Sequence, residues 1–527
     1  MNTQALRQKI LDLAIRGKLV PQDPNDEPAS VLLERIRTEK QQMVKDGKLK
    51  TKDIKNDTII FKGEDNLHYE KFHDGTVKCI EDEIPFEIPE GWVWTRLGMI
   101  GNWQAGATPS KGNTKYYKGN IPWLKTGDLN DNYITKIPEH ISELALKETS
   151  VKLNPTGSIL IAMYGATIGK LGILTFPATT NQACCACQPS DAIIAKYLFS
   201  FLLSHRQTFI QRGTGGAQPN ISKEKIVSTL IALPPLEEQK RIAKAIIDLL
   251  KITGNIESKK QCLHNSLENT KSKILDLAIR GKLVPQDPNE EPASVLLERI
   301  QAEKEELIKQ GKIKRDKNDS IIFKGDDNSY YEQFADGRIE NIEDEIPYYL
   351  PEGWEWCRVS TICLINPRNQ LDDGADVSFV PMPNICEGYS NSHSSDIRKW
   401  GKVKSGYTHF KENDIGIAKI TPCFENRKSV IFKDLINGCG AGTTELHILR
   451  IINQCIIGKY LLCLFKTDDF ISAGISTFTG AVGQKRISTG FISNYPVPVP
   501  PMSEQKRIVE VIKKSFSYLD QISKSLS

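Results

Sequence analysis

Apolar residues recur along residues 242–277 at alternating steps of four and three, the spacing of a helix with one narrow apolar seam. Eight of the eleven seam positions are apolar, and the exceptions are Thr253, Lys260 and Thr270. At about 1.5 Å per residue such a helix spans roughly 50 Å. This length and the narrow seam favour a coiled-coil helix over an amphipathic helix lying on a globular core. The apolar seam positions are Ile242, Ile246, Leu249, Ile256, Leu263, Leu267, Ile274 and Leu277.

The same spacing begins again near the end of the sequence. Ile508, Ile512, Leu519, Ile522 and Leu526 keep it, with Ser515 the only exception. The segment KILDLAIRGKL, which completes the central helix, also occurs near the N-terminus, at 9–19. We therefore expect the second long helix to be divided between the two chain ends, which adjoin in space. It should lie antiparallel to the central helix.

The sequence contains a large internal repeat. KILDLAIRGKLVPQDPN at 9–25 recurs unchanged at 273–289, and IEDEIPFEIPEGWVW at 80–94 recurs as IEDEIPYYLPEGWEW. PPLEEQKRI at 234–242 recurs as PPMSEQKRI at 500–508. We call these repeated blocks the frame. Two similar frames predict two similar halves, arranged as a closed ring with approximate two-fold symmetry.

The segments between the frame blocks scarcely resemble each other. Within them, GSILIAMYGATIGKLGIL reads as two strands joined by a turn, and KYLFSFLLS and KYLLCLFK read as helices. The predicted fold class is α+β, with two domains of mixed, curved sheet plus helices, separated by the antiparallel helix pair. The predicted segments are 1–94 and 234–357 as conserved regions, 95–233 and 358–499 as variable domains, and 500–527 as the C-terminal conserved helix. A short helix is expected at 31–40 and an exposed linker at 45–58.

The net charge of +4 is unevenly distributed. Residues 95–235 hold 14 Lys/Arg and 7 Asp/Glu, a net charge of +7. Residues 358–501 hold 16 and 12, a net charge of +4, so the rest of the chain carries −7. Two basic domains separated by acidic connectors suggest two surfaces for a polyanion, although basic faces are often only solvated.

Composition narrows the class of protein further. No apolar run approaches the ~20 residues of a membrane span, and the N-terminus lacks the apolar core of a signal peptide. The twelve cysteines show no paired metal-ligand spacing, and Cys184, Cys185 and Cys187 read as buried strand residues. We therefore expect no metal site and a cytoplasmic protein with reduced thiols.

Polar loops in the variable domains carry the candidate nucleic-acid contacts. Gly-rich turns allow the backbone to approach phosphates, amide side chains can bond base edges in pairs, and Lys or Arg can read guanine or hold phosphate. The alternative for any single residue is a solvated lysine or a core aromatic. The candidates are Lys111, Tyr116, Tyr117, Lys125, Tyr164, Thr167, Lys170, Arg212, Thr214, Gln218, Asn220 and Lys223, then Arg368, Tyr407, Lys419, Thr421, Asn426, Arg427, Lys428, Gln484, Lys485 and Arg486.

Catalytic motifs are missing from the sequence. There is no GxxxxGK[ST] phosphate loop and no Asn/Asp-Pro-Pro-aromatic motif of adenine methylation. Glu412, Asp414 and Lys419 come closest to a nuclease cluster but lack the usual spacing. We expect a non-catalytic chain and no catalytic residues.

The repeated blocks resemble the conserved regions of Type I restriction-modification specificity subunits, the HsdS family. GATPSKGNTKYYKGNIPWLKTGDL, GTGGAQPNIS and DIGIAKITPCFENRKS look like that family's target-recognition domains. The resemblance implies that each domain reads one half of a bipartite site in double-stranded DNA. It also implies helices that set the spacer and dock two methyltransferase subunits, with two restriction-translocase subunits joining them. S-adenosylmethionine, ATP and magnesium would belong to those partners, with no cofactor in this chain.

Two other classes remain open on the sequence. A coiled-coil scaffold that binds proteins without reading DNA would share the helices, but the +7 and +4 domains argue against it. A fused enzyme that reads, modifies and cuts DNA would need the missing motifs.

Overall fold

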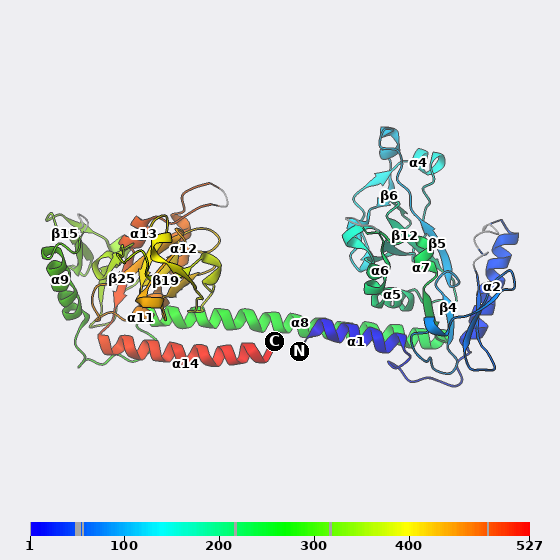
Figure 1. Ribbon diagram of the computed structural model, residues 1–527, viewed down its shortest axis with the longest axis horizontal. Helices are drawn as coiled ribbons and strands as arrows, with labels where there is room; N and C mark the ends of the chain where they lie inside the picture. The colour runs from blue at the N-terminus through cyan, green and yellow to red at the C-terminus, as the bar shows by residue number, and fades with distance from the viewer. Residues whose placement is uncertain are drawn as a thin grey trace. The chain divides into compact units, whose positions relative to one another are not determined.

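The computed structural model divides into two compact units, Met1–Lys259 and Lys260–Ser527 (Figure 1). It describes residues 2–47, 54, 57–214, 219–315, 319–481 and 484–526. Most of the expected linker at 45–58, residues 48–53, 55 and 56, therefore lies outside the described residues. Among the helices described, none combines the length and apolar character that a membrane span requires.

The frame of the first unit is an antiparallel helix pair. Helix α1 (Thr3–Ile15) lies against the first part of α8 (Leu236–Ile279), which begins in this unit and ends in the second. Arg7 pairs with Glu257 at 2.9 Å, whereas Gln22, farther along the chain, donates to Glu238. Since the partner numbers fall as the chain advances, the two helices run in opposite directions.

The second unit contains the equivalent pair. Helix α14 (Met502–Leu526) lies against the last part of α8, and the Lys271 ammonium pairs with Asp520 at 2.9 Å. Gln286, beyond the end of α8, donates to Glu504 at 3.1 Å. The antiparallel pairing is thus confirmed within each unit. The expected joining of the chain ends and the ring involve both units together and stay predictions.

Most of the predicted seam is buried. Ile242, Ile246, Leu267, Ile508 and Ile512 are buried, and Leu249, Ile256 and Leu519 are half-buried. Leu263 and Ile522 are 41% and 44% exposed, so the seam prediction is wrong at these two positions. Near the end of α8 the buried residues are Leu275, Ala278 and Ile279, one position after the predicted Ile274 and Leu277. A straight helix has 3.6 residues per turn, so its buried face drifts away from a strict seven-residue repeat.

A buried glutamate fastens each frame. Glu238, in the first turn of α8, accepts hydrogen bonds from Trp92 Nε1 at 2.9 Å and Gln22 Nε2 at 3.1 Å. In the second unit Glu504 accepts from Trp354 and Gln286 at the same distances. Burial raises the pKa of both carboxyls. Each of the recurring PQDP, EGW and EEQKR or SEQKR blocks contributes one residue to this cluster.

Each frame also carries a helix, a three-stranded antiparallel sheet and a two-stranded sheet. The helix expected at 31–40 is confirmed as the longer α2. In the first unit these elements are α2 (Ala29–Lys45), β1 (Ile59–Lys62), β2 (His68–Lys71), β3 (Val77–Cys79), β4 (Val93–Arg96) and β13 (Leu230–Leu233). In the second they are α9 (Ala293–Lys309), β14 (Ser320–Lys324), β15 (Tyr330–Phe334), β16 (Ile339–Asn341), β17 (Glu355–Arg358) and β26 (Pro496–Val499).

The variable domain of the first unit holds two sheets, ordered β5-β12-β9-β10-β7 and β11-β6-β8. Strand β9 is apolar throughout because its residues pack in two different clusters. Ile159 and Ile161 pack in the cluster that includes Tyr197 of α5, whereas Leu160 packs in a second cluster with Leu124. The strands are β5 (Gly101–Ala105), β6 (Ile121–Leu124), β7 (Asn132–Ile134), β8 (His140–Ile141), β9 (Ile159–Ala162), β10 (Leu171–Leu174), β11 (Thr179–Thr180) and β12 (Cys184–Pro189). The helices are α4 (Glu143–Glu148), α5 (Ala195–Ser204), α6 (Arg206–Arg212) and α7 (Lys223–Val227).

The second variable domain largely repeats this topology, with four strands in each sheet where the first domain has five and three. Its sheets are ordered β18-β25-β22-β23 and β20-β19-β24-β21, and β19 pairs in parallel with β24 as β6 does with β11. One mixed sheet was predicted for each domain, but each domain has two sheets. Three of these four sheets are mixed, and the sheet β18-β25-β22-β23 is wholly antiparallel. The strands are β18 (Cys363–Ile365), β19 (Asp376–Val380), β20 (Asp396–Lys399), β21 (Thr408–Lys411), β22 (Ile415–Ala418), β23 (Ser429–Ile431), β24 (Cys439–Gly442) and β25 (Leu446–Ile451). The helices are α10 (Val359–Ile362), α11 (Gly458–Leu464), α12 (Asp468–Ser476) and α13 (Thr489–Asn494).

Candidate nucleic-acid interface

In the first unit, the turn between β9 and β10 lies beside the polar loop that precedes α7. The Gly165 N–H donates to the Pro219 carbonyl at 2.8 Å, and β-bridges join Asn220 to both Tyr164 and Thr214. This pairing exposes Tyr164, Thr214 and Asn220. The structure thus brings together the candidates Tyr164, Thr167, Lys170, Thr214 and Asn220, while Gln218 lies outside the described residues.

The second unit forms the same pairing between the turn after β22 and the loop before α13. The Thr421 N–H donates to the Lys485 carbonyl at 3.0 Å, and Ile420 forms a β-bridge with Arg486. The Arg486 guanidinium donates to both carboxylate oxygens of Glu445, at 2.8 and 2.9 Å. These hydrogen bonds lower the pKa of Glu445. The cluster brings together the candidates Lys419, Thr421, Gln484, Lys485 and Arg486.

One backbone arrangement therefore presents different chemistry in the two units. The bridge formed by Tyr164 and Asn220 in the first unit is formed by Ile420 and Arg486 in the second. A phenol and an amide at one pair of positions are replaced by an aliphatic chain and a guanidinium. This is the arrangement expected of two surfaces that bind by one geometry and select different targets.

The first unit also has a hollow of about 440 Å³, which we call the β6–β11 hollow. Lys125 directly follows β6 and Asn181 directly follows β11, and the Asn181 N–H donates to the Leu124 carbonyl at 3.0 Å. The two strands are parallel, so their carboxyl ends, where ligands commonly bind in such sheets, meet here. The hollow is lined by Thr108, Lys111, Tyr117, Trp123, Lys125, Glu139, Asn181 and Gln182.

Three predicted residues line this hollow. The Lys125 ammonium pairs with Glu139 and lies 5.4 Å from the centre of the Trp123 ring. The Tyr117 hydroxyl donates to the Pro109 carbonyl at 2.5 Å, and burial raises the pKa of Tyr117. Lys111 is exposed. Thr108, Glu139, Asn181 and Gln182 also line the hollow but were not predicted from the sequence. For Asn181 and Gln182 the only available signal was a polar Asn-Gln pair after the short run TFPATT.

Several other candidates are held by contacts within the protein. Arg212 donates to Thr229 Oγ1 at 2.8 Å, the Tyr116 hydroxyl donates to Glu148 at 3.1 Å, and Lys223 is half-buried at the start of α7.

Four candidates of the second unit are anchored in the same way. Arg427 pairs with Asp468 and donates to the Lys466 carbonyl at 3.0 Å. Asn426 donates to Glu387 at 3.2 Å, and Lys428 to the Met382 carbonyl at 3.4 Å. Arg368 donates to the carbonyl of Tyr407, which is a fifth candidate, at 3.1 Å. Both residues are distant in the sequence from the loops of the cluster.

The residues considered for other chemistry have structural contacts. Both carboxylate oxygens of Asp414 accept from Arg450, and Glu412 accepts from the Asp434 and Leu435 backbone. Cys184, Cys185 and Cys187 are buried in β12, as predicted, and burial raises the pKa of Cys185 to about 12. Within the described residues, no group of three or more His, Cys, Asp or Glu could hold a metal ion.

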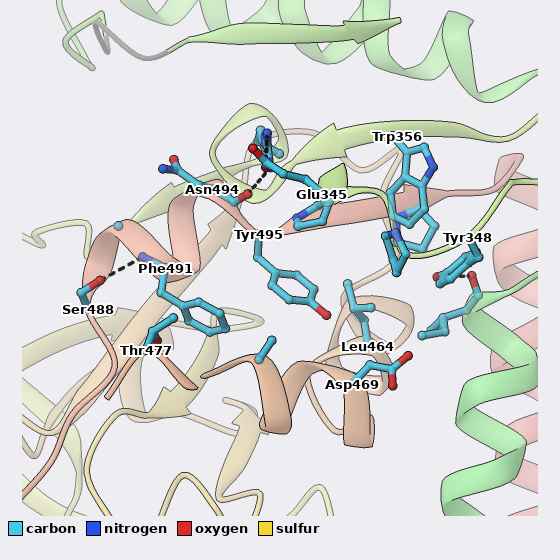
Figure 2. A pocket seen from close by; sticks show the side chains of 17 residues that line it. Glu345, Tyr348, Trp356, Leu464, Asp469, Thr477, Ser488, Phe491, Asn494 and Tyr495 are labelled. Atoms are coloured by element: carbon cyan, nitrogen blue, oxygen red, sulfur yellow. Dashed lines mark hydrogen bonds and ion pairs between the residues drawn. The ribbon is translucent and has the colours of Figure 1, made fainter. Parts of the chain in front are cut away.

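A second pocket, of about 560 Å³, lies between the frame and the variable domain of the second unit (Figure 2). Its frame wall includes Trp356 and Tyr348, and its domain wall includes Phe491 and Tyr495. In Figure 2 the Tyr495 hydroxyl points toward the side where Leu464 and Asp469 lie. Apolar atoms make up most of its lining, alongside charged groups such as Asp469.

The two units define a duplicated protein, with one repeated frame and two divergent polar surfaces. Comparison with known proteins identifies the family of the chain. Residues 89–264 and 351–526 each match the Type I restriction modification DNA specificity domain. These matches cover more than half of the chain, and the chain belongs to this family.

Individual relatives match parts of the chain. A segment of 250 residues is 50% identical to the Type I restriction enzyme EcoEI specificity subunit of Escherichia coli and 49% identical to the EcoAI specificity subunit of the same species. Each match covers 47% of this chain and 39% of the relative. The matched segment thus spans about two fifths of these relatives. The match to one solved chain of a type I R-M system covers 84% of this chain and 94% of the solved chain, with 16% identity and a TM-score of 0.49.

Proposed function

We propose that this chain is the DNA sequence-specificity subunit of a Type I restriction-modification enzyme, and that each variable domain reads one half of a bipartite site. The observation that carries the proposal is the loop pairing repeated with different side chains, Tyr164 and Asn220 against Ile420 and Arg486. Amide and guanidinium groups bind base edges, and Arg is the commonest reader of guanine.

Charge supports DNA as the target. The variable domains carry +7 and +4, while the rest of the chain carries −7. A polyanion is therefore attracted to the domains that differ and repelled by the frame that repeats. We expect DNA affinity to fall steeply with salt concentration, because bound lysines and arginines release counterions from the phosphates.

The frame has a separate role in this proposal. Its helices set the gap between the half-sites and dock two methyltransferase subunits, to which two restriction-translocase subunits add. The chain itself is non-catalytic, and the partner subunits bind S-adenosylmethionine, ATP and magnesium. The repetition of the frame supports this role, since similar frames suit two copies of one partner.

The test is to map methylated adenines in a host that expresses this chain with its methyltransferase subunit. The expected motif has two short specified parts with an unspecified gap. Replacing residues 95–233 with the corresponding domain of a relative should change one part and leave the other unchanged. A motif unaltered by the exchange, or methylation that does not depend on this chain, contradicts the proposal. A protein-binding scaffold would give the second of these results.

A further inference from the structure

We propose that the β6–β11 hollow binds the edge of one adenine in the DNA, with the Asn181 amide as the reading group. The inference rests on the proposed function and deepens it, because it assigns one base of the first half-site to a residue that lies outside the loop cluster.

The Asn181 side chain carries a hydrogen-bond acceptor that has no donor. Asn181 Oδ1 is buried and has no hydrogen-bond partner within the described part of the chain. Buried polar atoms in folded proteins are nearly always paired, so a turn of the Asn181 amide toward the hollow that it lines, where a donor from outside the chain pairs with this oxygen, is favoured. The backbone of Asn181 is fixed, because a Cβ on Gly106 would meet its carbonyl oxygen at 2.2 Å. The chain just after β5, at Gly106, therefore passes directly over Asn181 and holds it in place.

Charge favours a base over a phosphate inside the hollow. Three charged residues line it, and two of them, Lys125 and Glu139, neutralise each other in an ion pair. A phosphate beside Lys125 would also face the Glu139 carboxylate. Lys111 is exposed and has no ion pair with any other described residue, so it suits a phosphate near the hollow. At about 440 Å³ the hollow falls within the range of roughly 300–1,000 Å³ typical of small-ligand sites.

The chemistry of the amides points to adenine. An asparagine side chain offers one acceptor and one donor, which match the N6 amino group and N7 of adenine in the major groove. Beside it, Gln182 Oε1 accepts from the Thr108 hydroxyl. This contact directs the Gln182 nitrogen, a donor, away from Thr108. Both amides then present a donor, and only Asn181 presents a free acceptor.

The same sheet edge in the second unit carries different groups. There β24 ends at Gly442 and is followed by Thr443 and Thr444, where β11 is followed by Asn181 and Gln182. Hydroxyls replace amides at this edge. The second domain therefore lacks the adenine-reading pair at the equivalent place, and Thr444 offers a matched control position.

The experiment selects DNA from a pool of duplexes with a randomised segment, using the full chain with its methyltransferase subunits, and sequences the bound fraction. Asn181→Asp keeps an acceptor and loses the donor, so one position of the first half-site should shift from adenine to cytosine, whose N4 amino group donates. Asn181→Ala should reduce discrimination at that position by roughly 10-fold or more and leave the other positions unchanged.

Two further variants separate reading from positioning. Gln182→Ala should weaken discrimination at the same or the adjacent base pair, whereas Lys111→Ala should weaken binding to all sequences alike. Thr444→Ala should leave the first half-site unchanged.

The outcomes distinguish the inference from the proposed function. A wild-type chain that selects a bipartite motif, with Asn181 variants that select the same motif at unchanged affinity, overturns the inference alone. A wild-type chain that selects no motif overturns both. If the Asn181 variants do not fold by thermal melting, Gln182→Ala decides, and an unchanged motif for that variant counts against the hollow.

Discussion

Arg358 and Glu332 form an ion pair that is nearly shielded from water, with side chains 8% and 6% exposed. Arg358 also pairs with Glu345 at 2.9 Å and donates to the Asn494 carbonyl at 2.7 Å. It thereby ties the three-stranded sheet to the two-stranded sheet and to the variable domain. Arg96 and Glu70 make the equivalent contact in the first unit at 2.6 Å. At this scale the repeat preserves a buried charge network.

Replacing Glu332 with Gln should lower the free energy of unfolding by about 3–5 kcal/mol at pH 7, because it leaves Arg358 without its buried partner. Burial alone would raise the pKa of Glu332, but hydrogen bonds from Arg358 and Ser320 outweigh it and lower the pKa overall. The pair therefore stabilises the fold above the usual glutamate pKa of 4.5 and loses this effect as the pH falls through the lower, folded-state value.

Urea unfolding at pH 7 and at pH 3 measures this difference. The gap between wild type and Glu332→Gln should shrink at pH 3. Glu340→Gln, at an exposed pair with Arg338, is the control and should change stability by less than about 0.5 kcal/mol at either pH. An equal gap at both pH values contradicts the assignment.

At the scale of elements, the sequence predicted the helices and strands well where one periodicity governs them. The long α8, the β9–β10 hairpin and the helices α5 and α11 follow from spacing and apolar runs. The sheets were harder, because β11 has two residues and its parallel pairing with β6 joins segments about 55 residues apart. For the same reason the β6–β11 hollow was only half predicted: Lys111, Tyr117 and Lys125 stood in one recognisable motif, whereas Asn181 enters through the tertiary fold.

The helix α14 offers a matched comparison of two isoleucines. Ile508 is fully buried and Ile522 is 44% exposed. Ile508→Ala should destabilise the second unit by about 2–5 kcal/mol, because it leaves a cavity in the core. Ile522→Ala should cost less than about 0.5 kcal/mol in the isolated chain. Thermal unfolding of the two variants gives the comparison, and similar losses for both would place Ile522 in a contact that its exposure does not show.

At the scale of the whole molecule, each unit contains a complete frame cluster of its own. Glu238, Trp92 and Gln22 serve the first unit, and Glu504, Trp354 and Gln286 the second. The repeat in the sequence predicted this duplication. The recognised bases could not be predicted, because the reading side chains stand on loops whose residues the repeat does not constrain.

Inserting seven residues after Leu267 in α8 tests the role of the helix in setting the gap. Seven helical residues add about 10.5 Å, close to three base pairs at ~3.4 Å each. The methylated motif should keep both specified parts, and its unspecified gap should lengthen. If the specified parts themselves change, the helix does not act as the spacer.

The identical block at 9–25 and 273–289 has a consequence for inheritance. A genetic crossover within such a block, between this gene and that of a relative, exchanges everything up to the next block as one cassette. Every buried frame contact is restored after the exchange if the second parent supplies the same glutamate, tryptophan and glutamine, as the two halves of this chain do. A lineage can thus acquire a new preference in a single recombination, without the series of compensating substitutions that a redesigned core requires.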